Sequence, residues 1–405
     1  MASEPGQPVT DPTSDYDIFD PGFVRDPFPV MASIRESGCP IAHTERWGGS
    51  WLPTRYDDVV AMAQEYDLFT SNDVLVTPAP PGSESLDIYP AVAAPPISSD
   101  PPEHHWHRRL ILPFFAPQAV AKYESITREF CHSLIDGFIA DGEADAAADY
   151  AQQIPVRVIA LMLGIPPEMS DTFTGWVRGL LETGLVDPAS RIESRNNILV
   201  YLAEEIADRQ RAPREDDLIT TLLAAEVDGE RVPVEYVHGV ANLMLIAGID
   251  TTWSSIGASL WHLAQHPEHR AQLRDDPGLW PTAVEELLRA YAPVTMARLV
   301  SRDTEFEGCP MHAGDRVLMA FPAANRDPRQ FDRPDDVILD RQHNRHVAFG
   351  AGIHRCAGSN LARLELRVAL QAWLERIPDF ELVDPAAVTW AGGQVRGPRA
   401  CRVRF

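Results

Sequence analysis

The chain has 405 residues, of which 45% are hydrophobic and 23% charged. This composition supplies a large buried core and excludes intrinsic disorder, collagen-like repeats and a small disulfide scaffold. The formal net charge of −24 argues against nucleic acid or an anionic lipid surface as a general partner.

The length suits either two domains or one large fold. Residues 1–15 are rich in proline, serine, threonine and aspartate, which predicts a disordered tail. We interpret residues 16–405 as a single domain. Eight prolines between residues 76 and 102 interrupt any regular element. This stretch is therefore expected to be a long loop that is either disordered or a lid over a site.

The sequence has no feature of export or membrane insertion. The N-terminus has no basic segment followed by an apolar run, and no stretch reaches the roughly 18 apolar residues that a spanning helix needs. The five cysteines are scattered and odd in number, which favours a reducing compartment over a disulfide framework. We therefore expect a soluble, cytoplasmic protein without a membrane anchor.

Apolar residues at three- and four-residue spacing predict helices over residues 151–163, 192–209, 236–265 and 361–376. The third of these follows Pro233 and stops before Pro267. Its apolar residues occupy most faces, so we expect it to run through the middle of the molecule. Strand patterns are few and short, around residues 51–52, 316–319 and both ends of 388–405. The predicted fold class is mostly α with a small β part.

The stretch from His346 to Gly358 contains the most informative group of potential ligand residues in the chain. It reads His-Val-Ala-Phe-Gly-Ala-Gly-Ile-His-Arg-Cys-Ala-Gly and directly precedes the helix predicted from residue 361. A cysteine just before a helix start lies near free backbone N–H groups, which favour the thiolate, a strong ligand for soft metals. The glycines at positions 350, 352 and 358 permit a tight turn and the close approach of a flat molecule.

Three other interpretations of this stretch stay open. The glycines at 350 and 352 could begin a dinucleotide-binding loop, but arginine replaces the third glycine of that pattern and no βαβ unit surrounds it. The cysteine could be an inert structural residue. A zinc-binding interaction protein would use the histidines with the cysteine, although their spacing matches no standard finger or ribbon. Its candidate ligands are His343, His346, His354 and Cys356.

The pattern Phe-Gly-x-Gly-x-His-x-Cys-x-Gly resembles the cysteine-ligand loop of the cytochrome P450 family, with every fixed position filled. The resemblance implies that Cys356 is the thiolate ligand of a haem b iron and that Phe349 adjoins the cofactor. It covers nearly the whole chain, from about residue 15 to residue 405. It implies the P450 fold, with a long central helix across a buried haem.

Residues 247–252, Ala-Gly-Ile-Asp-Thr-Thr, lie in the middle of the long predicted helix. Glycine and threonine are poor helix formers, which points to a selected role such as opening the helix, admitting water or dioxygen, and relaying protons. A structural alternative is a threonine that bonds back to a carbonyl one turn earlier. The segment is similar to the acid–alcohol motif of the P450 family, which implies Asp250 and Thr251 as the catalytic proton-delivery pair.

Glu286 and Arg289 share one face of a predicted helix, at a spacing that is common in surface pairs. In order and spacing they match the Glu-x-x-Arg motif of the family, with Arg341 as the implied third member of a buried charge network. Such a network would fix the cysteine loop in place, so its role would be structural.

A buried haem needs partners for its two propionates. The resemblance implies five side chains as partners of the propionates. Two of them are four residues apart on one helix turn, one is an arginine in an extended segment, and two are histidines near the cysteine ligand. These residues are His104, Arg108, Arg298, His354 and His346. On helical geometry the histidines at 105 and 107 point away from this site and are expected to be solvated.

The resemblance implies a bacterial-type P450 monooxygenase that inserts one atom of O2 into a hydrophobic organic substrate, by hydroxylation or O-dealkylation. We expect no fused flavin or iron–sulfur domain in a chain of this length, so electrons from NAD(P)H would arrive through a separate ferredoxin and ferredoxin reductase. We expect a monomer. Parts of the proline-rich loop would adjoin the substrate pocket. The other pocket residues implied by the family's usual positions are Met244, Ala247, Val294 and Thr295, with Gln394 and Val395 nearby.

Two other functions of a haem-thiolate protein stay open from the sequence. A peroxide-driven peroxygenase would share the cysteine loop but would not need the acid–alcohol pair. A haem-thiolate sensor that binds a ligand without turnover would not need that pair either.

The charge is unevenly distributed along the chain. Residues 341–405 contain ten arginines against five acidic residues, so this end is basic although the chain is acidic. Four arginines near the cysteine loop could form a docking surface for an acidic electron carrier, or could simply balance local acids. They are Arg345, Arg355, Arg363 and Arg367.

Overall fold

The computed structural model describes residues 7–78 and 94–405. The chain divides into two compact units. Unit 1 consists of Met1–Ala79, Gly278–Cys356 and Trp390–Arg396, and unit 2 consists of Pro80–Pro277, Ala357–Thr389 and Gly397–Phe405. The interpretation of residues 16–405 as one domain stays a prediction.

Unit 1 is built on a five-stranded sheet with the strand order β1-β2-β10-β7-β3. β10 is parallel to β2 and antiparallel to β7, and all five of its residues are buried, as expected for a central strand. In this register Arg298 lies opposite Val317. The strands are β1 (Ile41–Thr44), β2 (Ser50–Pro53), β3 (Phe69–Thr70), β7 (Thr295–Val300) and β10 (Arg316–Ala320). β8 (Thr304–Phe306) and β9 (Cys309–Met311) form a separate hairpin.

Short helices accompany this sheet. They are α1 (Pro21–Arg25), α2 (Phe28–Glu36), α3 (Tyr56–Gln64), α13 (Trp280–Ala290) and α14 (Phe321–Ala324). The core of unit 1 forms where apolar side chains of α3, among them Val59 and Met62, pack with Val317 and Met319 of β10. α3 therefore covers the sheet, and the cysteine loop lies against its C-terminal end, as described below.

Unit 2 is mainly helical. Its helices are α4 (Glu103–Ile111), α5 (Pro117–Ala121), α6 (Glu124–Phe138), α7 (Gln153–Leu163), α8 (Ser170–Leu181), α9 (Pro188–Arg211), α10 (Leu218–Leu223), α11 (Val234–Gln265), α12 (Pro267–Asp275) and α15 (Ser359–Arg376), with a π-helix at Ala146–Ala151. A three-stranded sheet has the order β11-β14-β4. The remaining strands are β4 (Glu143–Asp145), β5 (Glu226–Val227), β6 (Glu230–Arg231), β11 (Glu381–Leu382), β13 (Gly397–Ala400) and β14 (Arg402–Arg404), and β12 (Thr389–Ala391) spans the junction with unit 1.

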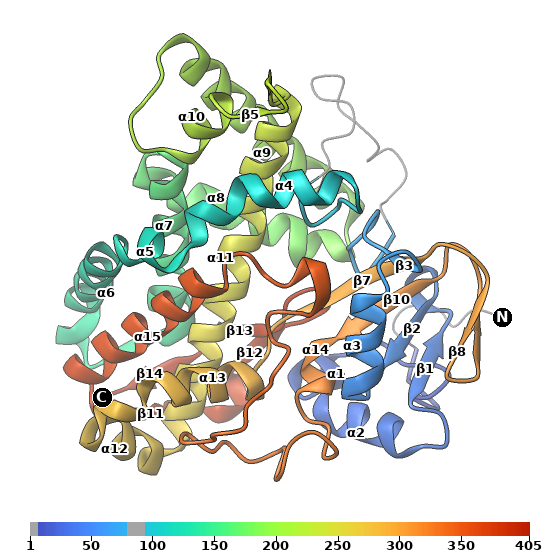
Figure 1. The fold of residues 1–405 in the computed structure, drawn as a ribbon. Coiled ribbons are helices and arrows are strands. Elements are labelled where there is room, and N and C mark those ends of the chain that lie inside the picture. Colours follow the sequence, from blue (N-terminus) through green and yellow to red (C-terminus); the bar gives the residue numbers. More distant parts are fainter. Residues whose placement is uncertain (1–6, 79–93) are drawn as a thin grey trace. The chain divides into compact units, whose positions relative to one another are not determined.

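The long helix α11 runs through the middle of unit 2. Its 32 residues extend about 48 Å, and most of them are buried. It contacts α7, α8, α9 and α15, which lie along it in Figure 1, where α11 is yellow and α15 is red. A helix that is apolar on most faces must be covered on most faces, so the predicted central position of α11 in this unit is confirmed.

Two glycines let other elements approach α11 closely. A Cβ at Gly248 would lie 2.5 Å from Cδ1 of Ile159, so glycine is needed here for α7 to pack. A Cβ at Gly397 would lie 2.3 Å from Cβ of Ser254, so β13 also lies directly against α11. α11 continues as an α-helix from Val234 to Gln265. The expectation that the glycine opens the helix is therefore not met, because close packing accounts for it.

The structure confirms the helices predicted over residues 151–163, 192–209, 236–265 and 361–376, as α7, α9, α11 and α15. The short strands near residues 51, 317 and the C-terminus are present as well. Residues 1–6 of the predicted tail and 79–93 of the proline-rich loop lie outside the described residues. In the described part of the chain no helix is both long and apolar enough to cross a bilayer.

Candidate active site

Cys356 lies at the end of a turn that backbone hydrogen bonds hold in shape. Its amide donates to the carbonyl of Phe349 at 2.8 Å. Gly350 and Gly352 have positive φ angles of 71° and 68°. A Cβ at position 352 would lie 2.3 Å from the carbonyl oxygen of Ala63 at the end of α3. Only glycine therefore allows this conformation and this contact.

The chemistry of the sulfur fits the axial ligand of a haem iron. Cys356 is exposed, whereas Cys131, Cys309 and Cys401 are buried. Burial raises the pKa of each of those three thiols to about 12, which keeps them protonated. Cys39 is also exposed, but its Sγ lies 3.5 Å from that of Cys309. An exposed sulfur on a rigid, glycine-containing turn is the arrangement that a thiolate ligand needs.

The two histidines near this cysteine have partners in unit 1. Nε2 of His354 lies 2.9 Å from Oγ of Ser71. Nε2 of His346 lies 3.0 Å from Oε2 of Glu285, and its Nδ1 accepts a hydrogen bond from the amide of Ala348. Both ring nitrogens of His346 are thus engaged by the protein, and a propionate contact would have to displace one of these partners. The zinc set of His343, His346, His354 and Cys356 is not brought to metal-binding distance.

Arg298 and the predicted pocket residues Val294 and Thr295 lie on or beside β7. Arg298 is buried and donates to the carbonyl of Ala297 at 2.7 Å. The amide of Thr295 donates to the carbonyl of Gln394, and Val294 forms a β-bridge with Val395. The Gln394 side chain accepts from the amide of Val76 and donates to the carbonyl of Val74. The segment at 394–395 therefore supports β7 from one side.

The predicted charge network is present and fully buried. Arg289 donates to both carboxylate oxygens of Glu286, at 2.8 Å each, and Nε of Arg341 donates to Oε2 of Glu286 at 2.9 Å. Burial by itself would raise the pKa of Glu286, but the hydrogen bonds and charges of the arginines lower it below its usual range. Arg289 also donates to backbone carbonyls of Asn325 and Asp336. The network therefore fastens residues 325–341 to α13.

In unit 2, Asp250 of α11 is wholly buried. Its Oδ1 accepts from Nη2 of Arg399 at 2.9 Å and from Oγ of Ser254 at 3.2 Å. Arg399 also donates to Oε2 of Glu182 at 2.8 Å. Burial raises the pKa of Asp250 above its usual range, and the charge of Arg399 opposes that shift. Oδ2 of Asp250 is buried without a hydrogen-bond partner among the described residues.

Sequence reasoning missed Arg399 as a site residue. It lies 149 residues from Asp250, in a strand whose pattern carries no chemical signal. The only local hint is Gly397, which allows β13 to reach α11.

Thr251 follows Asp250 on the same helix. Its Oγ1 donates to the carbonyl of Ala247 at 2.8 Å, which is the back-bond to the previous turn considered as the structural alternative. The predicted pocket residues Met244 and Ala247 lie about two turns and one turn before it on α11, respectively. α11 thus carries the predicted acid, the alcohol and two pocket residues.

His104 and Arg108 lie on α4, with His104 buried and Arg108 half-buried. The expectation that both His105 and His107 are solvated is right for His105, which is exposed, and wrong for His107. Nδ1 of His107 lies 2.7 Å from Oγ of Ser99, and its ring stacks on Tyr236 at 5.0 Å between centroids. α11 packs near α4 at this point, so a helical wheel of α4 alone could not predict the burial.

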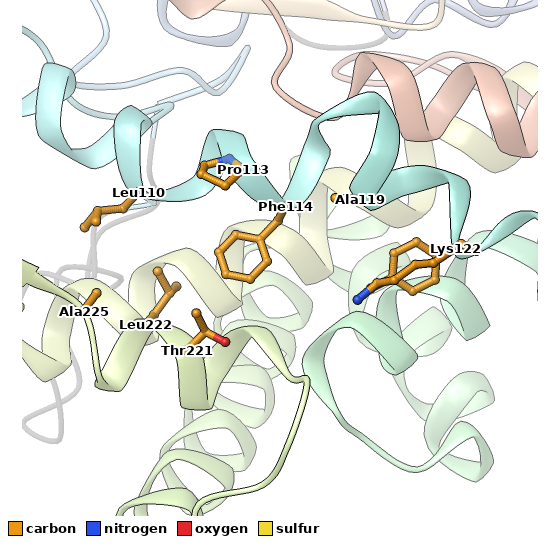
Figure 2. A pocket seen from close by; sticks show the side chains of 9 residues that line it. Leu110, Pro113, Phe114, Ala119, Lys122, Thr221, Leu222 and Ala225 are labelled. Carbon is orange, nitrogen blue, oxygen red and sulfur yellow. The ribbon is translucent and has the colours of Figure 1, made fainter.

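Unit 2 also holds an apolar pocket of about 370 Å³ between α4, α5 and α10 (Figure 2). Leu110, Phe114 and Leu222 point into it, with Lys122 at its edge. None of the predicted substrate-pocket residues lines this cavity.

Comparison with known proteins agrees with this picture. The family model for cytochrome P450 matches residues 180–276 and 279–383. A probable cytochrome P450 127A1 of Sinorhizobium fredii is 33% identical over 92% of this chain and 88% of its own length. The mycinamicin IV hydroxylase/epoxidase of Micromonospora griseorubida is 35% identical over 86% of this chain and 88% of its own.

Solved structures are similar as well. The cytochrome P450 PksS of the Bacillus subtilis 168 bacillaene polyketide synthase has a TM-score of 0.86 and 30% sequence identity, and covers 96% of this chain and 99% of that one. The identity of the two relatives extends over most of both chains, and the name of the Micromonospora griseorubida relative describes hydroxylation and epoxidation. The chain therefore belongs to the cytochrome P450 family and is a P450 monooxygenase.

Proposed function

We propose that this monooxygenase binds haem b through Cys356 and oxidises a hydrophobic organic substrate with electrons that a separate ferredoxin delivers from NAD(P)H. Membership of the family implies the haem, and when bound the haem supplies the activation of O2. The exposed Cys356 on its rigid turn supports the assignment of the axial ligand. Phe349 would adjoin the cofactor, since its carbonyl holds the ligand amide.

The family resemblance supports five side chains as partners of the haem propionates. His104 and Arg108 supply one group from α4, and Arg298 and His354 supply another from unit 1. Arginine suits this task because its planar donors match a carboxylate. His346 is the weakest member, because Glu285 already holds one of its nitrogens.

The observation that best supports the proposal is the burial and hydrogen bonding of the Asp250 carboxyl group. Arg399 and Ser254 hold one carboxylate oxygen in place, while the other is buried with no partner in the described part of the chain. A carboxyl group with a raised pKa, and with one oxygen that has no hydrogen-bond partner among the described residues, is suited to take up and release a proton. Thr251 is the next residue, and its hydroxyl would pass the proton on. A peroxide-driven enzyme or a ligand sensor would not need this pair.

The substrate is proposed to be a hydrophobic molecule. Met244, Ala247 and Val294 are apolar, and Thr295 is uncharged. The relatives named for mycinamicin and for polyketide biosynthesis suggest polyketide macrolides as the first compounds to screen. Binding would be detected as a change in the haem absorption spectrum.

The decisive experiment is turnover with a surrogate ferredoxin, its reductase and NADPH. The reduced, carbon-monoxide-bound spectrum of the parent should first show thiolate ligation, and Cys356→Ser should lose it. Thr251→Ala should still consume NADPH but yield several-fold less product per NADPH, with hydrogen peroxide formed instead. Asp250→Asn should lower kcat by about 10²-fold. The matched control is Thr252→Ala, one position further along α11, which should leave the coupling unchanged.

Two outcomes would contradict the proposal. If Thr251→Ala turned over with the coupling of the parent, the proton-delivery assignment would be wrong. If the parent gave product with hydrogen peroxide as fast as with ferredoxin and NADPH, it would be a peroxygenase.

A further inference from the structure

Three histidines gather where α11 ends and α12 begins. His262 lies in the last turn of α11, His266 is the residue between the two helices, and His269 lies in the first turn of α12. Pro267 starts α12, and it disfavours a helical conformation at His266, whose φ is −124° and ψ 74°. The break in the helix therefore places side chains from both helices on the same side.

We propose that His262, His266 and His269 bind one zinc ion. Each offers one ring nitrogen, and these three nitrogens all lie within 4.8 Å of one another. Imidazole nitrogens are preferred ligands of zinc and of neighbouring transition metals, and not of magnesium or calcium. Three protein ligands leave one position of a tetrahedral zinc ion for water.

The distances are close to those of an occupied site. Nε2 of His262 lies 2.8 Å from Nδ1 of His269, so these rings share a hydrogen bond. Two nitrogens on one tetrahedral zinc ion, each about 2.0–2.1 Å from the metal, are about 3.3 Å apart. Zinc would replace this hydrogen bond after the two nitrogens separate by a few tenths of an ångström. His266 has to turn, since its ring now stacks on that of His262 with 4.2 Å between the centroids.

A carboxylate lies beside one of the ligands. Nδ1 of His266 lies 2.8 Å from Oε1 of Glu268, which leaves Nε2 as the nitrogen for the metal. A histidine that donates its second nitrogen to a carboxylate is the usual outer arrangement of zinc sites, because it fixes the tautomer and makes the ligand more basic. The carboxylate also supplies negative charge beside the cation.

The surroundings allow an ion to enter. His262 is buried and gives the site a fixed side, whereas the His266 side chain is 42% exposed and faces solvent. The positive charge nearest in sequence is Arg270. Its guanidinium lies over the ring of Phe380 and donates to the carbonyl of Leu263. Zinc bound here would fasten the end of the central helix to α12, which is a structural role separate from the oxygen chemistry.

The test uses the haem-loaded protein without an affinity tag. It is titrated with zinc chloride by calorimetry, and its metal content is measured after equilibrium dialysis. We expect one zinc ion per chain. His266→Gln and His269→Gln should each weaken binding at least about tenfold, and Glu268→Gln should weaken it by about 10- to 100-fold. The control His312→Gln removes a histidine that is 73% exposed elsewhere in the chain and should change nothing.

A second measurement separates zinc binding from misfolding. Zinc should raise the Tm of the parent and of His312→Gln, but not that of His269→Gln, because ligands that bind the folded state stabilise it. Each variant is first checked for the carbon-monoxide spectrum of the parent, and the exposed position of His266 makes His266→Gln the safest of them. The proposal is overturned if millimolar zinc does not bind, or if the His266 and His269 variants take up zinc as the parent does.

Discussion

Arg399 shows how one side chain can pair with two acids inside a helical bundle. It is nearly buried and bonds to Asp250, Glu182 and Ser254 together. Removing water from a carboxylate is costly unless a cation replaces it. The position of the proposed proton donor therefore depends on Arg399.

We predict that Arg399→Gln lowers the free energy of unfolding by about 3–5 kcal/mol at pH 8, because it leaves buried carboxylates without their cation. The loss should be smaller at pH 5. Burial raises the pKa of Asp250, and without Arg399 it rises further, so the acid form that needs no cation is populated as the pH falls. Urea unfolding at the two pH values measures both effects.

The control for this variant is Arg402→Gln. Arg402 pairs with Glu143 on the surface with a side chain that is 66% exposed, so its loss should cost less than about 1 kcal/mol at either pH. Equal losses for the two variants would show that the buried ion pair is not what stabilises this region.

Glu365 of α15 is a second buried acid, and no arginine in the described part of the chain pairs with it. Burial raises its pKa to about 8, from 4.5, and its Oε2 has no hydrogen-bond partner among the described residues. Between these pH values the unfolded chain releases a proton that the folded chain keeps. The free energy of unfolding therefore falls as pH rises through this window.

We predict that Glu365→Gln stabilises the protein by up to about 3 kcal/mol at pH 7, and by little near pH 4. Thermal or urea unfolding across this range measures the difference. Glu375→Gln, on the same helix with a side chain that is 55% exposed, should stay within about 0.5 kcal/mol of the parent throughout. A Glu365→Gln variant that is less stable than the parent at pH 7 would mean that the carboxylate has a favourable partner.

At the scale of elements, the cysteine turn depends on its contact with α3 as well as on its own backbone. Gly352 has a positive φ, and a Cβ at this position would lie 2.3 Å from the carbonyl oxygen of Ala63. Gly314 has a positive φ of 94° but nothing within 4 Å of where its Cβ would be. An alanine at position 314 would therefore meet only backbone strain, whereas an alanine at position 352 would meet both backbone strain and a steric clash with α3.

We predict that Gly314→Ala costs about 1–2 kcal/mol, which is the strain of a left-handed backbone alone. Gly352→Ala should cost more and should also reduce the fraction of protein with a thiolate-type carbon-monoxide spectrum, since the turn must move away from α3. The free energy of unfolding and the carbon-monoxide spectrum are measured for both variants and compared. Equal costs with equal spectra would mean that the contact with α3 does not hold the ligand.

At the scale of the whole molecule, the charge is acidic overall and basic towards the C-terminus. Not all of that basic charge is available for a partner. Arg367 pairs with Glu124 at 3.0 Å, while Arg363 is half-buried near the start of α15. An acidic ferredoxin would be attracted by the local positive charge and repelled by the rest of the chain.

We predict that Arg363→Glu slows reduction by ferredoxin at low salt, and that the difference from the parent shrinks as salt screens the charges. Stopped-flow reduction at several ionic strengths measures it. Arg211→Glu, a reversal at a 72% exposed arginine at the end of α9, is the control and should have a smaller effect. If both variants behave alike, only the total charge matters and Arg363 is not part of a docking surface.

Most of the local structure follows from the sequence. The spacing of apolar residues predicted α7, α9, α11 and α15, because the periodicity of a helix is local and can be recognised within a few residues. The Glu286, Arg289 and Arg341 network also followed from its motif. The solvated position expected for His107 was wrong, since Tyr236, far away in the chain, covers it.

The sequence by itself determined the family, the glycine-containing turn at Cys356 and the helix that carries Asp250 and Thr251, because these are short motifs with local backbone requirements. Only the tertiary structure decided that Arg399 holds Asp250, that burial raises the pKa of Glu365, and that three histidines meet at the end of α11. The first two depend on contacts between distant segments, and the third on the bend between two helices. No periodic pattern along the chain records how such segments come together.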